Sequence, residues 1–458
     1  MDKKSNKTNI QYSWFKINDL IGNGGIFVDG DWVETKDQDP NGEVRLIQLA
    51  DIGIGDFRDR SNRFLTLDKA YKLNCTFLIK GDILIARLPE PLGRACIFPL
   101  DSPNKYITVV DVAIVRLDPT IVYNKYLCFI INTPQVKNEI LKYQSGTTRK
   151  RISRKNLATL KFPIPPLPTQ HRIVEKIEEL FSELESGVGS LKKAKEQIGL
   201  YKQSVLRAAF RGELVKREKA NVIRDRAEGR GQQAEVLKAA EPGGEYGVDG
   251  LPVGWRWVKL EDIVRVISGF AFKSKLFTND GVPVVKISNI GYSQFVEKNQ
   301  EFLPYEYIKK HNQYIVYPED LLIALTRPIT NNTTKVCYYP SNWTPGLLNQ
   351  RVAVIKTEES INRKYIYYYF QSEVFKNYLK SKFNETLQPN LSPKDLKNTT
   401  VPFPNDITII HLIVAEIEKR FSEAEHLEKS IDEGLEKAEA LRQSILKSAF
   451  EGRLLGSE

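Results

Sequence analysis

The chain has 458 residues, which exceeds the size that one hydrophobic core usually serves and predicts two or more domains. Hydrophobic residues make up 41% and charged residues 27%, as in soluble globular proteins, and no stretch approaches the roughly 18 consecutive apolar residues of a membrane span. The net charge of +10 favours a polyanionic partner, while four scattered cysteines without a CxxC pair predict reduced core thiols and a cytoplasmic location rather than a disulfide framework or a zinc site.

Residues 1–166 are predicted to form a globular domain. Short apolar runs at 45–52, 76–87 and 107–117, separated by polar turns, are typical of strands. A helix is expected over Tyr123–Tyr143. The expected fold class is therefore mixed α/β, with a small twisted sheet.

The most basic segment of this domain is the loop at 142–155, KYQSGTTRKRISRK, which has six basic residues, four Ser/Thr hydroxyls and no acid. Arginine, lysine, hydroxyl and backbone amide groups contact DNA phosphates, and arginine also pairs with guanine. Ser153 is better explained as the N-cap of a short helix. The DNA-contact candidates in this loop, with a solvated loop as the alternative, are Thr147, Thr148, Arg149, Lys150 and Arg151.

Two other groups of arginines are weaker candidates, because an ordinary surface position explains each of them equally well. Arg87 and Arg94 flank the turn ARLPEPLGRA. The second group follows a strand and consists of Arg58, Arg60 and Arg63.

A long helix is predicted over 167–214, directly after a proline-rich junction (163–168) that stiffens its attachment to the domain. Apolar residues recur in it at alternating spacings of four and three, the period of a coiled-coil seam. Such a helix is roughly 60 Å long and cannot bury its apolar stripe alone. The seam residues are Ile173, Ile177, Leu180, Leu184, Leu191, Ile198, Tyr201 and Val205.

A charged surface linker is expected over 215–250, and a second mixed α/β domain over 251–405. Its predicted strands lie at 282–290, 314–325 and 351–357. Its expected helix covers 364–382.

The second domain also carries candidates for DNA contact. The loop at 383–394 is much less charged than its counterpart but includes amides suited to adenine edges, and Ser392 before Pro393 is again explained as an N-cap. The candidates are Lys273, Ser274, Lys275, Arg327, Thr386, Gln388 and Asn390.

A second long helix is predicted over 406–458. Its weaker seam includes Ile413, Ile417, Leu427, Ile431, Leu441 and Ile445. The obvious partner of each helix is the other one, and of the two possible orientations we favour antiparallel pairing, in which a pseudo-twofold axis relates the two halves.

The chain is a tandem repeat, since blocks of the first half recur in the same order about 240 residues later. KGDILIAR (80–87) recurs as PEDLLIAL (318–325), and residues 173–214 align without gaps on 413–454 with 17 identities in 42 positions. Collinear similarity of this extent is not expected from two unrelated helices.

Motifs of catalysis are missing from the sequence. There is no phosphate-binding Gly-x4-Gly-Lys-Ser/Thr loop, and no Asn/Asp-Pro-Pro-aromatic motif of amino-methyltransferases. Asp82 and Asp320 occupy equivalent positions but are better explained as turn residues than as catalytic acids. A nuclease built from dispersed carboxylates remains an open alternative.

The pattern of two globular domains, each followed by a long helix, resembles the specificity subunit of type I restriction–modification enzymes. The resemblance covers nearly the whole chain. Its most specific parts are PIPPLPTQHRIVEKIEELF (163–181), FSE and the QS.L..AF.G.L pattern in both helices, GFAFKS (269–274) and LPVGW (251–255). The second helix departs from the family pattern at 405–421, where NDITIIHLIVAEIEKRF replaces the proline-rich lead-in.

The resemblance implies two target-recognition domains separated by helical spacers, which read a bipartite, asymmetric double-stranded DNA site with an unread spacer in phage defence. It implies two methyltransferase subunits and restriction subunits as partners, and no membrane. S-adenosylmethionine, ATP and Mg are expected on those partners, with no cofactor and no catalytic centre in this chain. A self-contained nuclease or methyltransferase and a free-standing DNA-binding repressor are the alternatives.

Overall fold

The computed structural model describes residues 12–89, 91–146, 149–215, 250–298, 300–382 and 390–455. The chain divides into two compact units. Unit 1 comprises Met1–Lys192 and Asp432–Glu458, and unit 2 comprises Lys193–Ile431. Each unit therefore contains one globular domain, the first half of the long helix that follows it, and the last half of the other long helix.

The described residues of the domain of unit 1 form three small sheets. The largest is antiparallel with the order β2-β8-β5-β6, the second has the order β4-β3-β7 with a parallel β3–β7 pair, and β1 pairs with β9. Its strands are β1 Ser13–Lys16, β2 Ile26–Asp29, β3 Val44–Ile47, β4 Phe64–Leu65, β5 Ile83–Ala86, β6 Ala95–Ile97, β7 Tyr106–Thr108, β8 Val112–Arg116 and β9 Lys161–Ile164. Its helices are α1 Ile17–Leu20, α2 Leu67–Lys72, α3 Asn124–Ile131, α4 Pro134–Lys142, α5 Arg154–Leu157 and the first part of α6 Leu167–Phe210.

The domain of unit 2 repeats this topology. The sheet β11-β20-β15-β18 corresponds to β2-β8-β5-β6, the sheet β13-β12-β19 with added β14 corresponds to β4-β3-β7, and β10–β21 corresponds to β1–β9. Its strands are β10 Trp255–Lys259, β11 Arg265–Ser268, β12 Val282–Val285, β13 Phe302–Leu303, β14 Ile315–Val316, β15 Leu321–Ala324, β16 Ile329–Thr330, β17 Thr333–Thr334, β18 Val336–Tyr338, β19 Gly346–Leu348, β20 Val352–Lys356 and β21 Thr400–Pro404. Its helices are α8 Leu260–Ile263, α9 Tyr307–Lys310, α10 Ser360–Gln371, α11 Glu373–Lys382, α12 Pro393–Lys397 and the first part of α13 Ile407–Phe450. The predicted repeat and mixed α/β class are confirmed.

Several elements are shorter than the apolar runs that predicted them. The run at 107–117 was expected as one strand, but it forms β7 and β8, because the chain turns at Val109–Asp111 from the sheet of β3 into the sheet of β5. The predicted helix over Tyr123–Tyr143 is interrupted, since Thr133 caps a new helix that begins with Pro134. The helix expected over 364–382 is divided in the same way before Glu373, where the Ser372 hydroxyl accepts the amide of Phe375.

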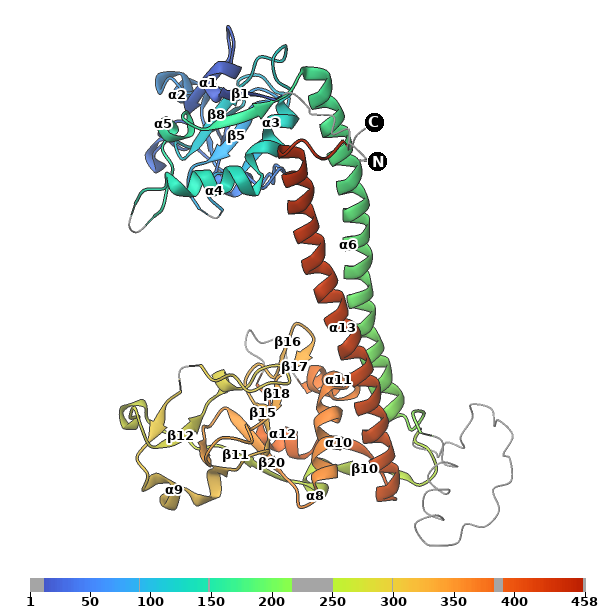
Figure 1. The fold of residues 1–458 in the computed structure, drawn as a ribbon. Helices are drawn as coiled ribbons and strands as arrows, with labels where there is room; N and C mark the ends of the chain where they lie inside the picture. Colours follow the sequence, from blue (N-terminus) through green and yellow to red (C-terminus); the bar gives the residue numbers. More distant parts are fainter. Residues whose placement is uncertain are drawn as a thin grey trace, which may run out of the picture. The chain divides into compact units, whose positions relative to one another are not determined.

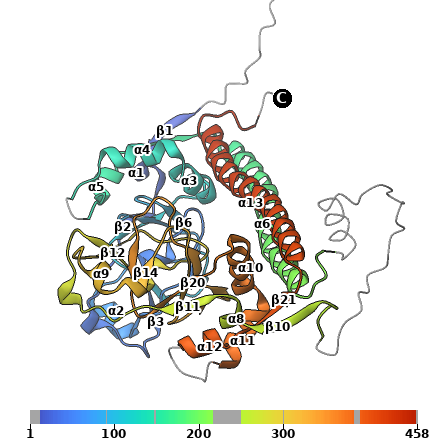
Figure 2. The same ribbon diagram turned by 90° about the horizontal axis from the view of Figure 1, so that it is seen from below.

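Two contacts hold α3 and α10 in place, one to the long helix that follows the domain and one to the strand just before that helix, and both recur. Lys125 pairs with Glu178 at 2.6 Å, and Lys364 pairs with Glu418 at 2.7 Å. The buried hydroxyl of Tyr126 donates to the Pro163 carbonyl at 2.7 Å, as its counterpart in α10 does to the carbonyl of Pro402. Figure 1 shows α10 alongside the first half of α13, and Figure 2 shows it between β20 and the long helices. These contacts explain the repeated Lys-Tyr pair.

Within unit 1 the two long helices pack antiparallel, as favoured from the sequence. Phe181 and Glu185 of α6 contact Arg442 of α13. Leu191, which lies further along α6, packs against Gly434, which lies earlier in α13, so the two helices run in opposite directions. The Arg442 guanidinium lies 4.3 Å from the centre of the Phe181 ring. In unit 2 the equivalent contact places the Lys202 ammonium 5.8 Å from the ring of Phe421. The repeated phenylalanines of the FSE motif thus each lie under a cation from the other helix.

The structure buries half of the fourteen residues predicted for the coiled-coil seam. The seven buried residues are Ile173, Ile177, Val205, Ile413, Ile417, Ile431 and Ile445. Leu180, Leu184, Leu191 and Ile198 are half-buried. Tyr201, Leu427 and Leu441 are 41%, 58% and 52% exposed, so their assignment to the seam was wrong. The neighbouring residues Lys202, Glu428 and Arg442 point inward instead. Their charges are compensated inside the seam by ion pairs and by contacts with aromatic rings.

Candidate nucleic-acid interface

The basic loop of unit 1 begins and ends at a tight hydrogen-bonded base. The backbones of Ser145 and Arg151 exchange two hydrogen bonds of 2.8 Å, and Gly146 turns the chain with a φ of +100°. Arg149, Lys150 and Arg151 are exposed in this loop, whereas Thr147 and Thr148 lie outside the described residues. The exposed arginines and lysine are therefore free to reach a polyanion.

The loop base is anchored to the central sheet through main-chain atoms. The amide of Ile152, which is buried, donates to the carbonyl of Arg87 at the end of β5 at 3.1 Å. The Ser153 hydroxyl then accepts the amide of Asn156 at 3.1 Å and caps α5, as its sequence position indicated. The loop thus leaves the domain at the end of β5.

Unit 2 anchors its counterpart loop in the same way. The amide of Leu391 donates to the carbonyl of Leu325 at 2.7 Å, and the Ser392 hydroxyl accepts the amide of Asp395 at 3.0 Å. Asn390 is exposed and forms a bridge with Thr326. Of the candidates in this loop, Thr386 and Gln388 lie outside the described residues.

The remaining candidates of unit 2 lie in two different places. Arg327 is exposed beside the loop base, with a φ of 46° that is uncommon for a residue with a side chain. Lys273, Ser274 and Lys275 are exposed near the other sheet, where the neighbouring Phe272 packs against β12 and β19. Arg327 and Asn390 therefore belong to one surface, and Lys273–Lys275 belong to another.

Arg94 does not lie on the surface, and its assignment as a DNA contact was wrong. It is 5% exposed, and its guanidinium donates to the carbonyls of Leu49, Ile52, Leu88 and Pro91 at 2.7–3.2 Å. Burial lowers its pKa from the ordinary value. The sequence could not separate it from a surface arginine, because three of these four acceptors lie in loops whose course depends on the fold.

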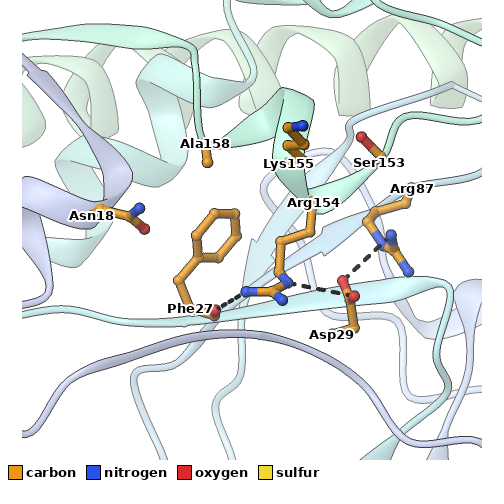
Figure 3. A pocket seen from close by; sticks show the side chains of 8 residues that line it. All are labelled: Asn18, Phe27, Asp29, Arg87, Ser153, Arg154, Lys155 and Ala158. Atoms are coloured by element: carbon orange, nitrogen blue, oxygen red, sulfur yellow. Dashed lines mark hydrogen bonds and ion pairs between the residues drawn. The ribbon is translucent and has the colours of Figure 1, made fainter.

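A cleft of about 430 Å³ opens beside the loop base in unit 1. Figure 3 shows Asp29 between the guanidinium groups of Arg87 and Arg154, with ion-pair distances of 3.3 and 3.4 Å. Arg154 also donates to the carbonyl of Phe27 at 2.9 Å. The cleft is lined by Asn18, Phe27, Asp29, Arg87, Ser153, Arg154, Lys155 and Ala158. Its three basic residues and one acid give it a net charge of +2, which suits a polyanion.

Sequence reasoning had missed Asp29, Arg154 and Lys155 as individual candidates. Arg154 and Lys155 belong to the basic segment already singled out, so its charge was the available signal. Asp29 stands alone at the end of β2, and only the pairing of β2 with β8 brings it to the arginines. Arg87 is only 14% exposed, and it donates to the Val110 carbonyl, so most of its guanidinium serves the fold.

The repeated aspartates of the two domains are structural, as their turn positions indicated. Asp82 accepts the amide of Ile79 at 2.9 Å and two hydrogen bonds of 2.8 Å from Arg116, whose pKa this pairing raises. Asp320 accepts the amide of Tyr317 at 2.8 Å and pairs with Lys356 at 3.4 Å. Neither carboxylate is presented to a substrate.

Two other kinds of site were sought in the described part of the chain. No group of three or more histidine, cysteine or acidic residues there is arranged to hold a metal ion. No helix within the same ranges combines the length and the apolar character needed to cross a bilayer.

A family match covers most of the chain. Residues 1–192 and 252–437 match the family described as the type I restriction modification DNA specificity domain. The two matched segments correspond to the two repeats.

Two relatives are named as specificity subunits of type I restriction enzymes. The specificity subunit of the type I restriction enzyme MjaVIII of Methanocaldococcus jannaschii is 27% identical over 322 residues, which cover 70% of this chain and 67% of the relative. The specificity subunit of the EcoAI enzyme of Escherichia coli is 24% identical over 395 residues, covering 73% and 66% of the two chains. The alignments thus span about two thirds of each relative's length.

Two solved structures share the fold. A chain from a study of complex assembly and conformational transition of the type I R-M system has a TM-score of 0.67 at 18% identity, with 96% of this chain and 98% of that chain covered. The HsdS subunit from Thermoanaerobacter tengcongensis has a TM-score of 0.51 at 18% identity, with 96% and 97% covered.

Proposed function

Since the chain belongs to the family of type I restriction–modification DNA specificity subunits, the non-catalytic components of those systems, we propose that its two domains each read one half of a bipartite, asymmetric DNA site. The base pairs between the two halves are unread. Phosphate contacts supply most of the affinity, so that binding weakens steeply with salt. Contacts to base edges supply the specificity.

The observation that carries this proposal is that the repeats share their scaffold and differ at one surface. The same bonds recur in both units: helices are capped by Ser153 and Ser392, and the loops are anchored by the amides of Ile152 and Leu391. The residues next to these anchors differ: basic Arg149–Arg151 in unit 1 has its counterpart in a loop of much lower charge. A duplicated reader whose two halves recognise different sequences requires this combination.

The partners follow from the same assignment. We infer that the long helices, which are similar in both repeats, dock two copies of a methyltransferase subunit, and that restriction subunits join this complex. S-adenosylmethionine, ATP and Mg then belong to those subunits, and the methylated base is adenine. The charged, outward-facing sides of α6 and α13 leave room for such partners, because only one stripe of each helix is used for pairing.

Mapping methylated adenines in the host genome tests the proposal. The expected result is one split motif with different halves, which disappears when the gene is deleted. The purified chain should be inactive alone and active with the neighbouring methyltransferase subunit. Activity of the chain alone would identify a self-contained enzyme, and tight specific binding without any methyltransferase would identify a repressor.

The exposed arginines of the basic loop provide a second test. Replacing Arg149 and Arg151 by alanine should weaken DNA binding at every sequence and reduce the slope of log affinity against log salt by about 1 for each lost phosphate contact. The melting temperature should not change, since both side chains are exposed. Unchanged affinity across salt concentrations would remove this loop from the interface.

We further infer that the helices set the length of the unread spacer. Seven residues inserted after Lys192 and after Ile431 preserve the 3.5-residue seam and lengthen each helix by about 10 Å. At about 3.4 Å per base pair, the methylated motif should gain about three unread base pairs. A spacer of unchanged length in a strain that still methylates its DNA would contradict this role.

A further inference from the structure

Arg154 is the one arginine of the unit 1 cleft whose guanidinium is both fixed and substantially exposed. Its Nη1 donates to the carbonyl of Phe27 at 2.9 Å, its Nε faces Asp29 at 3.4 Å, and its charge lies 5.8 Å from the centre of the Phe27 ring. Its side chain is nevertheless 46% exposed. Among the described residues the Arg154 guanidinium makes no other hydrogen bond, so its Nη2 donors remain available to a ligand in the cleft.

Asp29 holds this arginine in place and is itself held by Arg87. One Asp29 oxygen is buried without a hydrogen-bond partner among the described residues, and it depends on the Arg87 ion pair at 3.3 Å. Arg87 is fixed in turn by its bond to the Val110 carbonyl. A carboxylate that steadies an arginine reduces the side-chain entropy which that arginine would lose on binding a ligand.

The corresponding positions of unit 2 do not have this arrangement. The strand registers place Ser268 at the position of Asp29, and Leu325 at the position of Arg87. The residue after the capping serine is Arg154 in unit 1 and Pro393 in unit 2. All three residues of the cluster thus have uncharged counterparts at positions with the same backbone geometry.

We propose that Arg154 is a specificity-determining residue that pairs with a guanine in the half-site read by the first domain, with Asp29 and Arg87 as positioning residues. This inference rests on the proposed function. A phosphate contact would be useful in both domains, because every duplex offers phosphates, whereas a base contact is needed only where the target requires it. The remaining donors of a fixed guanidinium match the O6 and N7 acceptors of guanine in the major groove.

The experiment uses the full chain in complex with its methyltransferase subunits. Methylation mapping first defines the wild-type site, and duplexes with each base pair replaced in turn then measure the preference at every position. The wild type should prefer a G·C pair at one position by about 10- to 100-fold. R154A should reduce that preference to about 1 and leave the other positions unchanged. R154K, which keeps the charge but not the planar fork, should do the same.

Two further variants complete the test. D29N, which keeps Arg154 but removes the charge that steadies it, should weaken the preference at that same position. K72A is the control, because Lys72 lies in the same domain, is 69% exposed and pairs with Asp68 outside the cleft. It should change no preference. Thermal melting establishes that each variant is folded.

Equal weakening at all sequences by R154A and R154K, or no change at all, would overturn the base-reading role. If the folded R154A complex binds no duplex, the test rests on R154K, which keeps the positive charge of the wild type. A weaker base preference at one position in R154K supports the inference, and an equal loss of affinity for all sequences refutes it. The absence of any split motif for the wild type would instead refute the proposed function.

Discussion

Lys137 of α4 tests whether a buried ammonium without a hydrogen-bond partner destabilises the core of unit 1. Its Nζ atom is buried without a hydrogen-bond partner among the described residues, and burial lowers its pKa from 10.5 to about 7. The equivalent residue of unit 2, Lys376, donates from Nζ to Gln203 Oε1 at 2.9 Å and to the Asn332 carbonyl at 3.3 Å. Two lysines at equivalent positions therefore differ in whether their ammonium is satisfied.

The unsatisfied lysine should destabilise unit 1 at neutral pH. Because the folded-state pKa is lowered, the unfolded chain binds the extra proton between about pH 7 and pH 10.5, and stability rises with pH across this window. At about 1.4 kcal/mol per pKa unit, the charge costs the fold about 4 kcal/mol at pH 7, and this cost falls by about 2 kcal/mol at pH 9. Below pH 7 the cost is complete.

K137M should consequently be more stable than the wild type at pH 7, with a gain that shrinks by about 2 kcal/mol at pH 9. Urea titration followed by hydrogen exchange of peptides from α3 and α4 measures the unfolding free energy of unit 1 itself. The matched variant K376M should be destabilised, because it leaves Gln203 and the Asn332 carbonyl without their donor. A K137M protein that is less stable than the wild type, or whose gain does not depend on pH, would refute the reasoning.

Two other predictions concern the long helices. Gly452 ends α13 with a φ of +71°, and a Cβ there would lie 2.6 Å from Tyr12 Cε2, so G452A should cost at least about 1–2 kcal/mol in thermal unfolding. G199A, with nothing within 4 Å, should stabilise the helix by about 0.5–1 kcal/mol, and the reverse order would contradict the role of Gly452. L441A should cost under about 0.5 kcal/mol because Leu441 is 52% exposed, whereas I445A should cost about 2–5 kcal/mol. Equal costs would restore Leu441 to the seam.

The repeat and its helices could be predicted because their signals are local or self-repeating. Heptad spacing, capping serines and proline junctions act within a few residues, and Ser153 and Ser392 cap helices as expected. The exact helix face could not be predicted in the same way. Leucine at 441 fits an apolar repeat better than Arg442 does, yet Arg442 lies inward because Phe181 and Glu185 of the other helix receive it.

Long-range contacts limited what could be predicted of the site. Arg94 and Arg154 are both arginines beside turns, but the first is consumed by four carbonyls and the second is presented in a cleft. Their difference arises from Leu49 and Ile52 in one case and from Asp29 in the other, all of them far away in the sequence. A local pattern of charge carries no information about such partners.

The way in which the loops are anchored explains how the loop sequences of the two domains could diverge while the scaffold stayed the same. The bond that anchors each loop joins the amide of Ile152 or Leu391 to the carbonyl of Arg87 or Leu325. Because both atoms belong to the main chain, the side chain at the anchoring position can change from arginine to leucine without breaking the bond. The capping hydroxyls of the serines that follow act on backbone amides as well. The scaffold therefore fixes where each loop leaves the domain, whatever side chains lie beside the anchoring bond. In the proposed function, those side chains are the ones that read DNA.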